Sequence, residues 1–151
     1  MNNYLEAWLI SHRMNEHLLV GINEAHLTDT GSKGRSVGEQ FAHIHNVRLM
    51  WIKAALPSLM DGQIKIEKED KLSKKLLFDR LEQSAKGISG VMEDGFKNGR
   101  VKGFKPHPEA FLAYMVAHEA HHRGQIILIL KENKHLPDNK TLYGLWEWGT
   151  K

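Results

Sequence analysis

The chain has 151 residues, enough for one domain with a sizeable core, and we expect residues 1–151 to form that one domain. Hydrophobic residues (41%) and charged residues (26%) occur in the proportions of a soluble globular protein. The net charge is only +3, and basic and acidic residues are interspersed along the chain, which argues against a nucleic-acid binder. There is no cysteine, which excludes disulfides, thiolate metal sites and a cysteine nucleophile, so any reacting thiol must arrive with a substrate or cosubstrate.

No apolar run in the sequence approaches the roughly 20 residues that cross a bilayer. Residues 1–8 contain Glu6 and lack the basic region and following apolar region of a signal peptide. We therefore expect a cytoplasmic protein that has neither a membrane nor a nucleic acid as a partner.

In chain order, the first two amphipathic helices are predicted from apolar residues that recur with the helical period. The first covers about residues 4–23. The second begins at Ser36, where Ser36 and Glu39 have the spacing of a capping box, and it ends before Pro57. A hydrophilic connection, about residues 58–72, follows it.

Two more helices and a tail complete the predicted architecture. The third helix covers about residues 73–96, and the fourth runs from Pro108, a residue suited to a first helical turn, to about residue 133. The tail, residues 136–151, is expected to pack back over the helices and carries the aromatic residues Tyr143, Trp146 and Trp148. Four amphipathic helices without a strand pattern predict an all-α four-helix bundle with a short aromatic C-terminal tail.

Histidine is unusually frequent, and five of the ten histidines fall in two short internal segments: His43, His45, His118, His121 and His122. On a helical wheel of the fourth helix, His118 and His122 lie inside or beside the sector that apolar residues direct to the core. That sector contains Phe111, Met115, Ile126 and Ile129. The spacing of His118 and His122 lets both imidazoles reach one ion, although hydrogen-bonded core histidines remain an alternative.

The second helix offers a third imidazole. Its apolar face is expected to be centred on Ile44, Val47, Trp51 and Ala55. His43 flanks this face and can turn inward, whereas His45 is expected to face solvent. With His43, the set becomes three imidazoles with positions left for water or substrate, as in catalytic zinc sites. Glu39 and Glu119 are candidates for a fourth ligand.

Other residues near these histidines have more ordinary interpretations. Gln125 is a candidate hydrogen-bond partner for a ligand histidine. Arg123 is expected to lie on the surface or between packed helices, with anion binding as the less favoured alternative. The aromatic residues are expected in the core rather than in a pocket wall: Trp8, Trp51 and Tyr114.

Two segments resemble the DinB-like family: Ser36 to Ile44 followed by Trp51, and His118 to Ile126. Their order and spacing match too, so the resemblance covers nearly the whole chain. It implies a four-helix bundle, often a homodimer, in which His43, His118 and His122 bind a divalent metal ion, usually nickel or zinc. His121 belongs to the motif but is implied not to be a ligand.

The resemblance also suggests a chemistry, because relatives include S-transferases that use bacillithiol, mycothiol or glutathione, and a mycothiol-dependent maleylpyruvate isomerase. We hypothesise that the metal lowers the pKa of a low-molecular-weight thiol cosubstrate or of water. The thiol would then be transferred to a small electrophilic substrate, or the water would hydrolyse such a substrate. The alternative is a non-catalytic metal-binding protein of stress response or interaction, which a fourth protein ligand closing the site would favour. Imidazole binds nickel, zinc, iron and manganese, so the sequence does not identify the metal.

Overall fold

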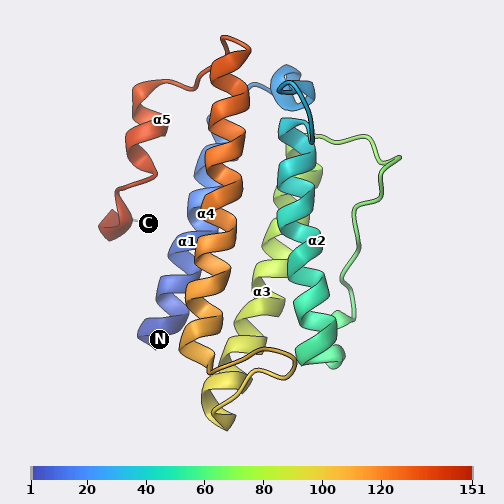
Figure 1. Ribbon diagram of the computed structural model, residues 1–151, viewed down its shortest axis with the longest axis vertical. Coiled ribbons are helices and arrows are strands. Elements are labelled where there is room, and N and C mark those ends of the chain that lie inside the picture. Colours follow the sequence, from blue (N-terminus) through green and yellow to red (C-terminus); the bar gives the residue numbers. More distant parts are fainter. Residues whose placement is uncertain (1, 151) are drawn as a thin grey trace.

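The computed structural model describes residues 2–150, which contain helices and no strand. Four long helices run side by side (Figure 1): α1 (Asn3–Val20), α2 (Val37–Ala55), α3 (Lys74–Asn98) and α4 (Pro108–Glu132). Shorter elements are α5 (Asn139–Gly144) and the 3₁₀ helices η1 (Glu24–Thr28), η2 (Pro57–Met60) and η3 (Trp148–Thr150). The predicted all-α four-helix bundle is confirmed, while Met1 and Lys151, the ends of the expected domain, lie outside the described residues.

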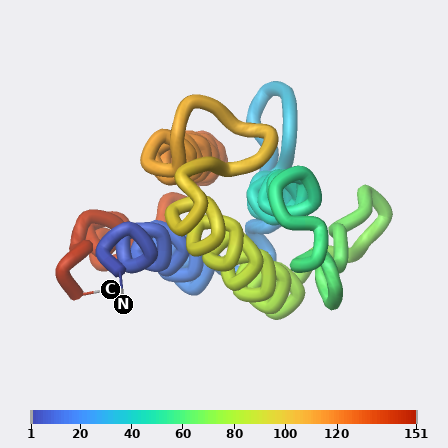
Figure 2. The backbone as a smooth tube through the Cα atoms, turned by 90° about the horizontal axis from the view of Figure 1, so that it is seen from below, coloured from blue at the N-terminus to red at the C-terminus, as the bar shows by residue number. Residues whose placement is uncertain are grey.

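The end-on view shows how the four helices are arranged (Figure 2). Helices α3 and α4 each pack against both α1 and α2. Consequently α4 lies between α1 and α2 on one side of the bundle, and its side chains can meet residues of α2 directly. Within residues 2–150, no helix is both long enough and apolar enough to cross a lipid bilayer.

Local hydrogen bonds fix the ends of the helices near their predicted positions. At the start of α2, Ser36 Oγ accepts from the Glu39 N–H and Glu39 Oε1 accepts from the Ser36 N–H, both at 3.2 Å, which completes the predicted capping box. Ser73 caps α3 in a similar way through the Leu76 N–H. Helix α1 ends three residues earlier than predicted, at Val20.

The C-terminal tail packs on the bundle, as predicted, through α5 and α1. The contact depends on small residues: a Cβ atom on Gly144 would collide with the His17 ring. The His17 ring also bonds the Thr141 carbonyl through Nε2 at 2.9 Å. The aromatic side chains of Tyr143 and Trp146 are largely exposed, at 69% and 80%, so they do not make this contact.

The interior consists of two apolar clusters separated by a polar layer. One cluster lies toward the start of α2 and includes Phe41 and Ile126, and the other lies toward its end and includes Ile52 and Phe111. Between them lie fully buried polar side chains, which include Asn15, His45, Arg48, Ser84 and Glu119. The central pair is ionic, since Arg48 donates to Glu119 through Nε at 2.7 Å and through a terminal nitrogen at 2.9 Å. This ion pair joins α2 to α4 at mid-height.

Candidate metal centre

Three histidines from two helices come together between α2 and α4. His43 of α2 and His118 and His122 of α4 each offer one nitrogen, and these three atoms lie within 4.8 Å of one another. His122 is 7% exposed, and the other two side chains are half-buried. The structure therefore brings together the three residues predicted as ligands, with His43 turned toward α4 as the helical wheel indicated.

Helix geometry explains how α4 supplies two of the three nitrogens. His118 and His122 are one turn apart, so their rings lie on one face with centroids separated by 4.6 Å. The centroid of the His43 ring is 4.5 Å from that of His122 and 5.5 Å from that of His118. His121 is exposed and is not part of the group.

A glutamine fixes the tautomer of His122. The Nδ1–H of His122 donates to Gln40 Oε1 at 2.7 Å, which leaves Nε2 with its lone pair. That nitrogen lies 3.2 Å from His118 Nε2. His118 Nδ1 is buried and has no hydrogen-bond partner among the described residues. Because one nitrogen of His43 lies within 4.8 Å of one nitrogen of each of the other two histidines, this donor set fits a single divalent ion.

The three imidazoles are neutral at pH 7. Burial, followed by the charges of His118 and His43, lowers the pKa of His122 to about 4. Burial is also the main cause that lowers the pKa values of His43 and His118. Neutral imidazoles keep their lone pairs, which is the form that binds a metal ion.

Neither candidate for a fourth ligand joins the site. Glu39 uses Oε1 in the capping box with Ser36. Glu119 is fully buried and accepts hydrogen bonds from Arg48 and from Asn15. In residues 2–150 the group therefore consists of three histidines, which leaves coordination positions for other molecules.

The prediction that His45 faces solvent is wrong. Its side chain is fully buried, Nε2 donates to the Ile64 carbonyl at 2.7 Å, and Nδ1 bonds Ser84 Oγ at 3.0 Å. Burial lowers the pKa of His45 to about 4. The buried face of α2 is centred on polar Arg48 rather than on Val47, and apolar periodicity could not show this. His45 thus holds the connection between α2 and α3.

The hydrogen-bond partner of the site is Gln40 rather than Gln125, whose side chain is exposed. Gln40 precedes His43 by almost one turn on the same helix, and this spacing is the sequence signal that could have identified it. Arg123 is the expected helix-packing residue, since it is buried and donates to Asn15 Oδ1 at 2.7 Å.

Aromatic residues continue the face of α4 on which the histidines lie. Trp8 is fully buried, as expected for the core, but Tyr114 is 38% exposed, so its predicted core position is wrong. The Tyr114 ring is nearly parallel to that of His118, with 6.2 Å between centroids, and meets the Trp51 ring edge-on at 5.7 Å. Tyr114 therefore provides an apolar surface beside the three histidines.

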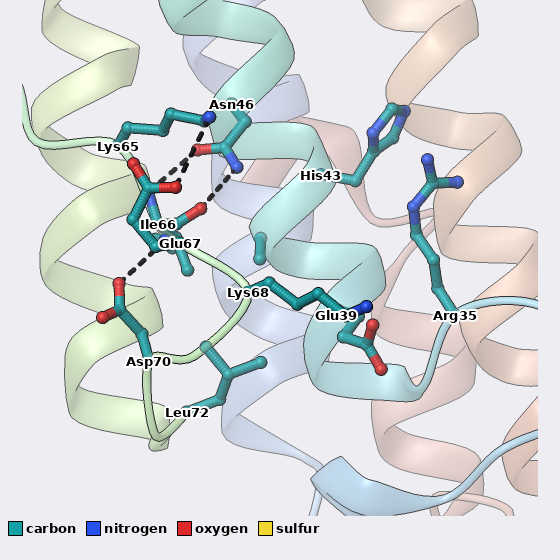
Figure 3. A pocket seen from close by; sticks show the side chains of 11 residues that line it. Arg35, Glu39, His43, Asn46, Lys65, Ile66, Glu67, Lys68, Asp70 and Leu72 are labelled. Atoms are coloured by element: carbon teal, nitrogen blue, oxygen red, sulfur yellow. Dashed lines mark hydrogen bonds and ion pairs between the residues drawn. The ribbon is translucent and has the colours of Figure 1, made fainter.

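Two cavities of about 330 Å³ each flank the three histidines. His43 lines the first, together with Asn46 and the connection that follows η2 (Figure 3). Asn46 holds that connection by donating to the Ile66 carbonyl at 2.9 Å and accepting from the Ile66 N–H at 3.0 Å. His122 lines the second cavity, and Arg35 lines both.

The fold and this site define an all-α bundle with a candidate three-histidine metal centre. The chain belongs to the DinB family, whose model matches residues 1–146. Among solved structures, it is similar to a DinB-like protein, YjoA, from Bacillus subtilis, with a TM-score of 0.63 and 20% identity over 91% of this chain and 97% of that one. At that identity the similarity supports the fold alone. No curated protein sequence matches the chain significantly.

Proposed function

We propose that this chain is a metal-dependent enzyme in which His43, His118 and His122 bind one divalent ion, nickel or zinc. The observation that carries the proposal is the convergence of three neutral imidazoles on one point without a fourth protein ligand in residues 2–150. Catalytic metal sites keep such an open position, whereas structural sites are closed by four protein ligands.

The ion, when bound, would supply Lewis-acid chemistry that lowers the pKa of a thiol cosubstrate or of water. The chain's own residues prepare the site for this role. Gln40 holds the His122 ring in the tautomer with a free Nε2 lone pair, and burial keeps the imidazoles unprotonated. The flanking cavities have the size of small-molecule sites.

We propose two reactions for this site: transfer of a low-molecular-weight thiol to a small electrophile, or hydrolysis of such a substrate. The absence of cysteine means that any thiol comes from a cosubstrate. We also propose, from the family resemblance, that the protein works in the cytoplasm as a homodimer, which light scattering on the purified protein would test.

The test begins with metal content. Untagged wild type, His118→Ala and His121→Ala would be loaded with nickel or zinc, desalted and measured by elemental mass spectrometry. We expect about one ion per chain in wild type and in His121→Ala, the matched control from the same helix, and almost none in His118→Ala. Wild type without metal after loading would refute the site.

The second step separates an enzyme from a non-catalytic metal protein. Loaded wild type would be assayed with glutathione or bacillithiol and the electrophile 1-chloro-2,4-dinitrobenzene, and with activated esters for hydrolysis. Turnover that disappears in His118→Ala and persists in His121→Ala supports the enzyme. Metal at full occupancy with no turnover in either assay favours the non-catalytic alternative.

A further inference from the structure

Arg35 occupies a special position beside the three histidines. It is the last loop residue before Ser36, the N-cap of α2, and its side chain lines both cavities. In Figure 3 its guanidinium extends in the same direction as the His43 ring, toward α4. A molecule in either cavity would therefore lie next to both Arg35 and one of the three histidines.

The guanidinium of Arg35 is exposed and makes no hydrogen bond or ion pair within residues 2–150. Of the neighbouring charges on the first cavity, Lys65 pairs with Glu67 at 3.5 Å, and Glu39 accepts from the Ser36 backbone. Lys68 and Asp70 also line this cavity, and Lys33 and Glu132 line the second. Arg35 thus presents five free donors in a planar fork, a geometry that matches a carboxylate.

The charge of Arg35 lies beside the three-histidine group, because Arg35 lines one cavity with His43 and the other with His122. This positive charge would repel a divalent ion held by the histidines. Three neutral ligands leave the ion's charge uncompensated, so Arg35 adds repulsion that an anion lying between the two cations would relieve.

We propose that Arg35 is the anion-binding residue of this site, holding the carboxylate of a small substrate or cosubstrate whose other end reaches the three histidines. This inference rests on the proposed function and narrows its substrates to small carboxylates. The planar fork of the guanidinium matches the two oxygens of one carboxylate, whereas a phosphate dianion would also lie near the carboxylates of Glu39 and Asp70 on the first cavity.

The test uses the full chain loaded with cobalt(II), whose visible spectrum reports binding at the metal. Wild type, Arg35→Met and Arg100→Met would be titrated with three pairs of acids of equal chain length: propionate and malonate, butyrate and succinate, and valerate and glutarate. Arg100→Met removes the same charge from an exposed loop arginine that lines neither of these two cavities. The second carboxylate of each diacid is the probe for Arg35.

In wild type and Arg100→Met, we expect at least one diacid to bind roughly tenfold more tightly than its monoacid, the effect of one charged hydrogen-bonded pair. Arg35→Met should lose this preference and bind cobalt alone at least as tightly as wild type, because a repelling charge is gone. A merely structural role for Arg35 would instead weaken cobalt binding in Arg35→Met.

The two proposals fail in different ways. If cobalt binds but no diacid is preferred, or if the preference persists in Arg35→Met, the role of Arg35 is refuted and the metal site stands. If wild type binds no cobalt, the metal site is refuted, and the role of Arg35 is refuted with it.

Discussion

The Nδ1–H of His122 donates to Gln40 Oε1 across 2.7 Å, and this bond links α4 to α2 next to the three histidines. Gln40 is 5% exposed, so the bond is protected from competing water. Metal-binding histidines commonly donate their second ring nitrogen to such a partner, which fixes the ring orientation and raises its basicity. Gln40 therefore has the position of a residue that tunes metal affinity without contacting the ion.

Replacing Gln40 by Met should weaken metal binding by about 10–100-fold, the usual cost of losing such a partner. Gln40→Glu is the matched control, because it keeps an oxygen that accepts from Nδ1–H and should retain wild-type affinity or better. Competition with a chelator measures both affinities, and thermal unfolding of the metal-free variants checks that each is folded. A folded Gln40→Met variant with wild-type affinity would show that the bond has no role in metal binding.

The helices and the three histidines could be predicted because their signals are local. The capping box at Ser36, the first-turn Pro108 and the spacing of His118 and His122 act within one or two helical turns, and each lies where expected. The inward position of His43 could be predicted from the helical wheel of its own helix alone, because His43 flanks the buried face.

The error at His45 and the failure to identify Gln40 have one physical cause. Burial of His45 depends on Ser84 and on the Ile64 carbonyl, which lie 39 and 19 residues away along the chain. Apolar periodicity assigns polar residues to the surface, so it misplaces those that are buried through distant partners. Apolar periodicity could not predict the pairing of Arg48 with Glu119 either, because these residues are 71 positions apart.

The buried ion pair of Arg48 and Glu119 yields a stability prediction. Glu119→Leu should cost about 3–5 kcal/mol of unfolding free energy, because it leaves the Arg48 charge buried without its partner. The double variant Arg48→Met/Glu119→Leu should recover part of that loss, since both charges are gone. Urea unfolding of the metal-free proteins measures both values.

A surface pair provides the control for this experiment. Lys75 and Asp79 lie at 2.6 Å on the exposed side of α3, and Lys75→Met should change stability by about 1 kcal/mol or less. If the double variant at Arg48 and Glu119 were less stable than Glu119→Leu alone, the unpaired charge would not be the source of the destabilisation.

Two glycine substitutions, one in the tail and one in α4, should have opposite effects on stability. Gly144→Ala places a Cβ against the His17 ring, which must move and give up its bond to Thr141, so α5 should loosen. Gly124→Ala, in α4, meets no atom within 4 Å and should stabilise by about 0.5–1 kcal/mol through helix propensity. Trypsin cleavage after Lys140 should become faster only in Gly144→Ala; equal rates would show that this contact does not hold the tail.

Acid should destabilise the metal-free protein partly through His45. Burial lowers its pKa from the ordinary value of 6.5 to about 4 in the folded state, so the unfolded chain binds more protons between these two pH values. The contribution of His45 to the free energy of unfolding is therefore fully present above pH 6.5 and decreases as the pH falls toward 4. Below pH 4, His45 causes no further loss of stability. At pH 5 the loss from His45 amounts to about 2 kcal/mol.

His45→Gln isolates this contribution from those of the other buried histidines. Unfolding by urea, with a chelator present, would be measured for both proteins at pH 7.5 and at pH 5. Because glutamine does not titrate, the difference in stability between the two pH values should be smaller in the variant by about 2 kcal/mol. Equal pH dependence in both proteins would mean that the buried His45 ring accepts a proton without cost, contrary to its position between Ser84 and the Ile64 carbonyl beside the Arg48 charge.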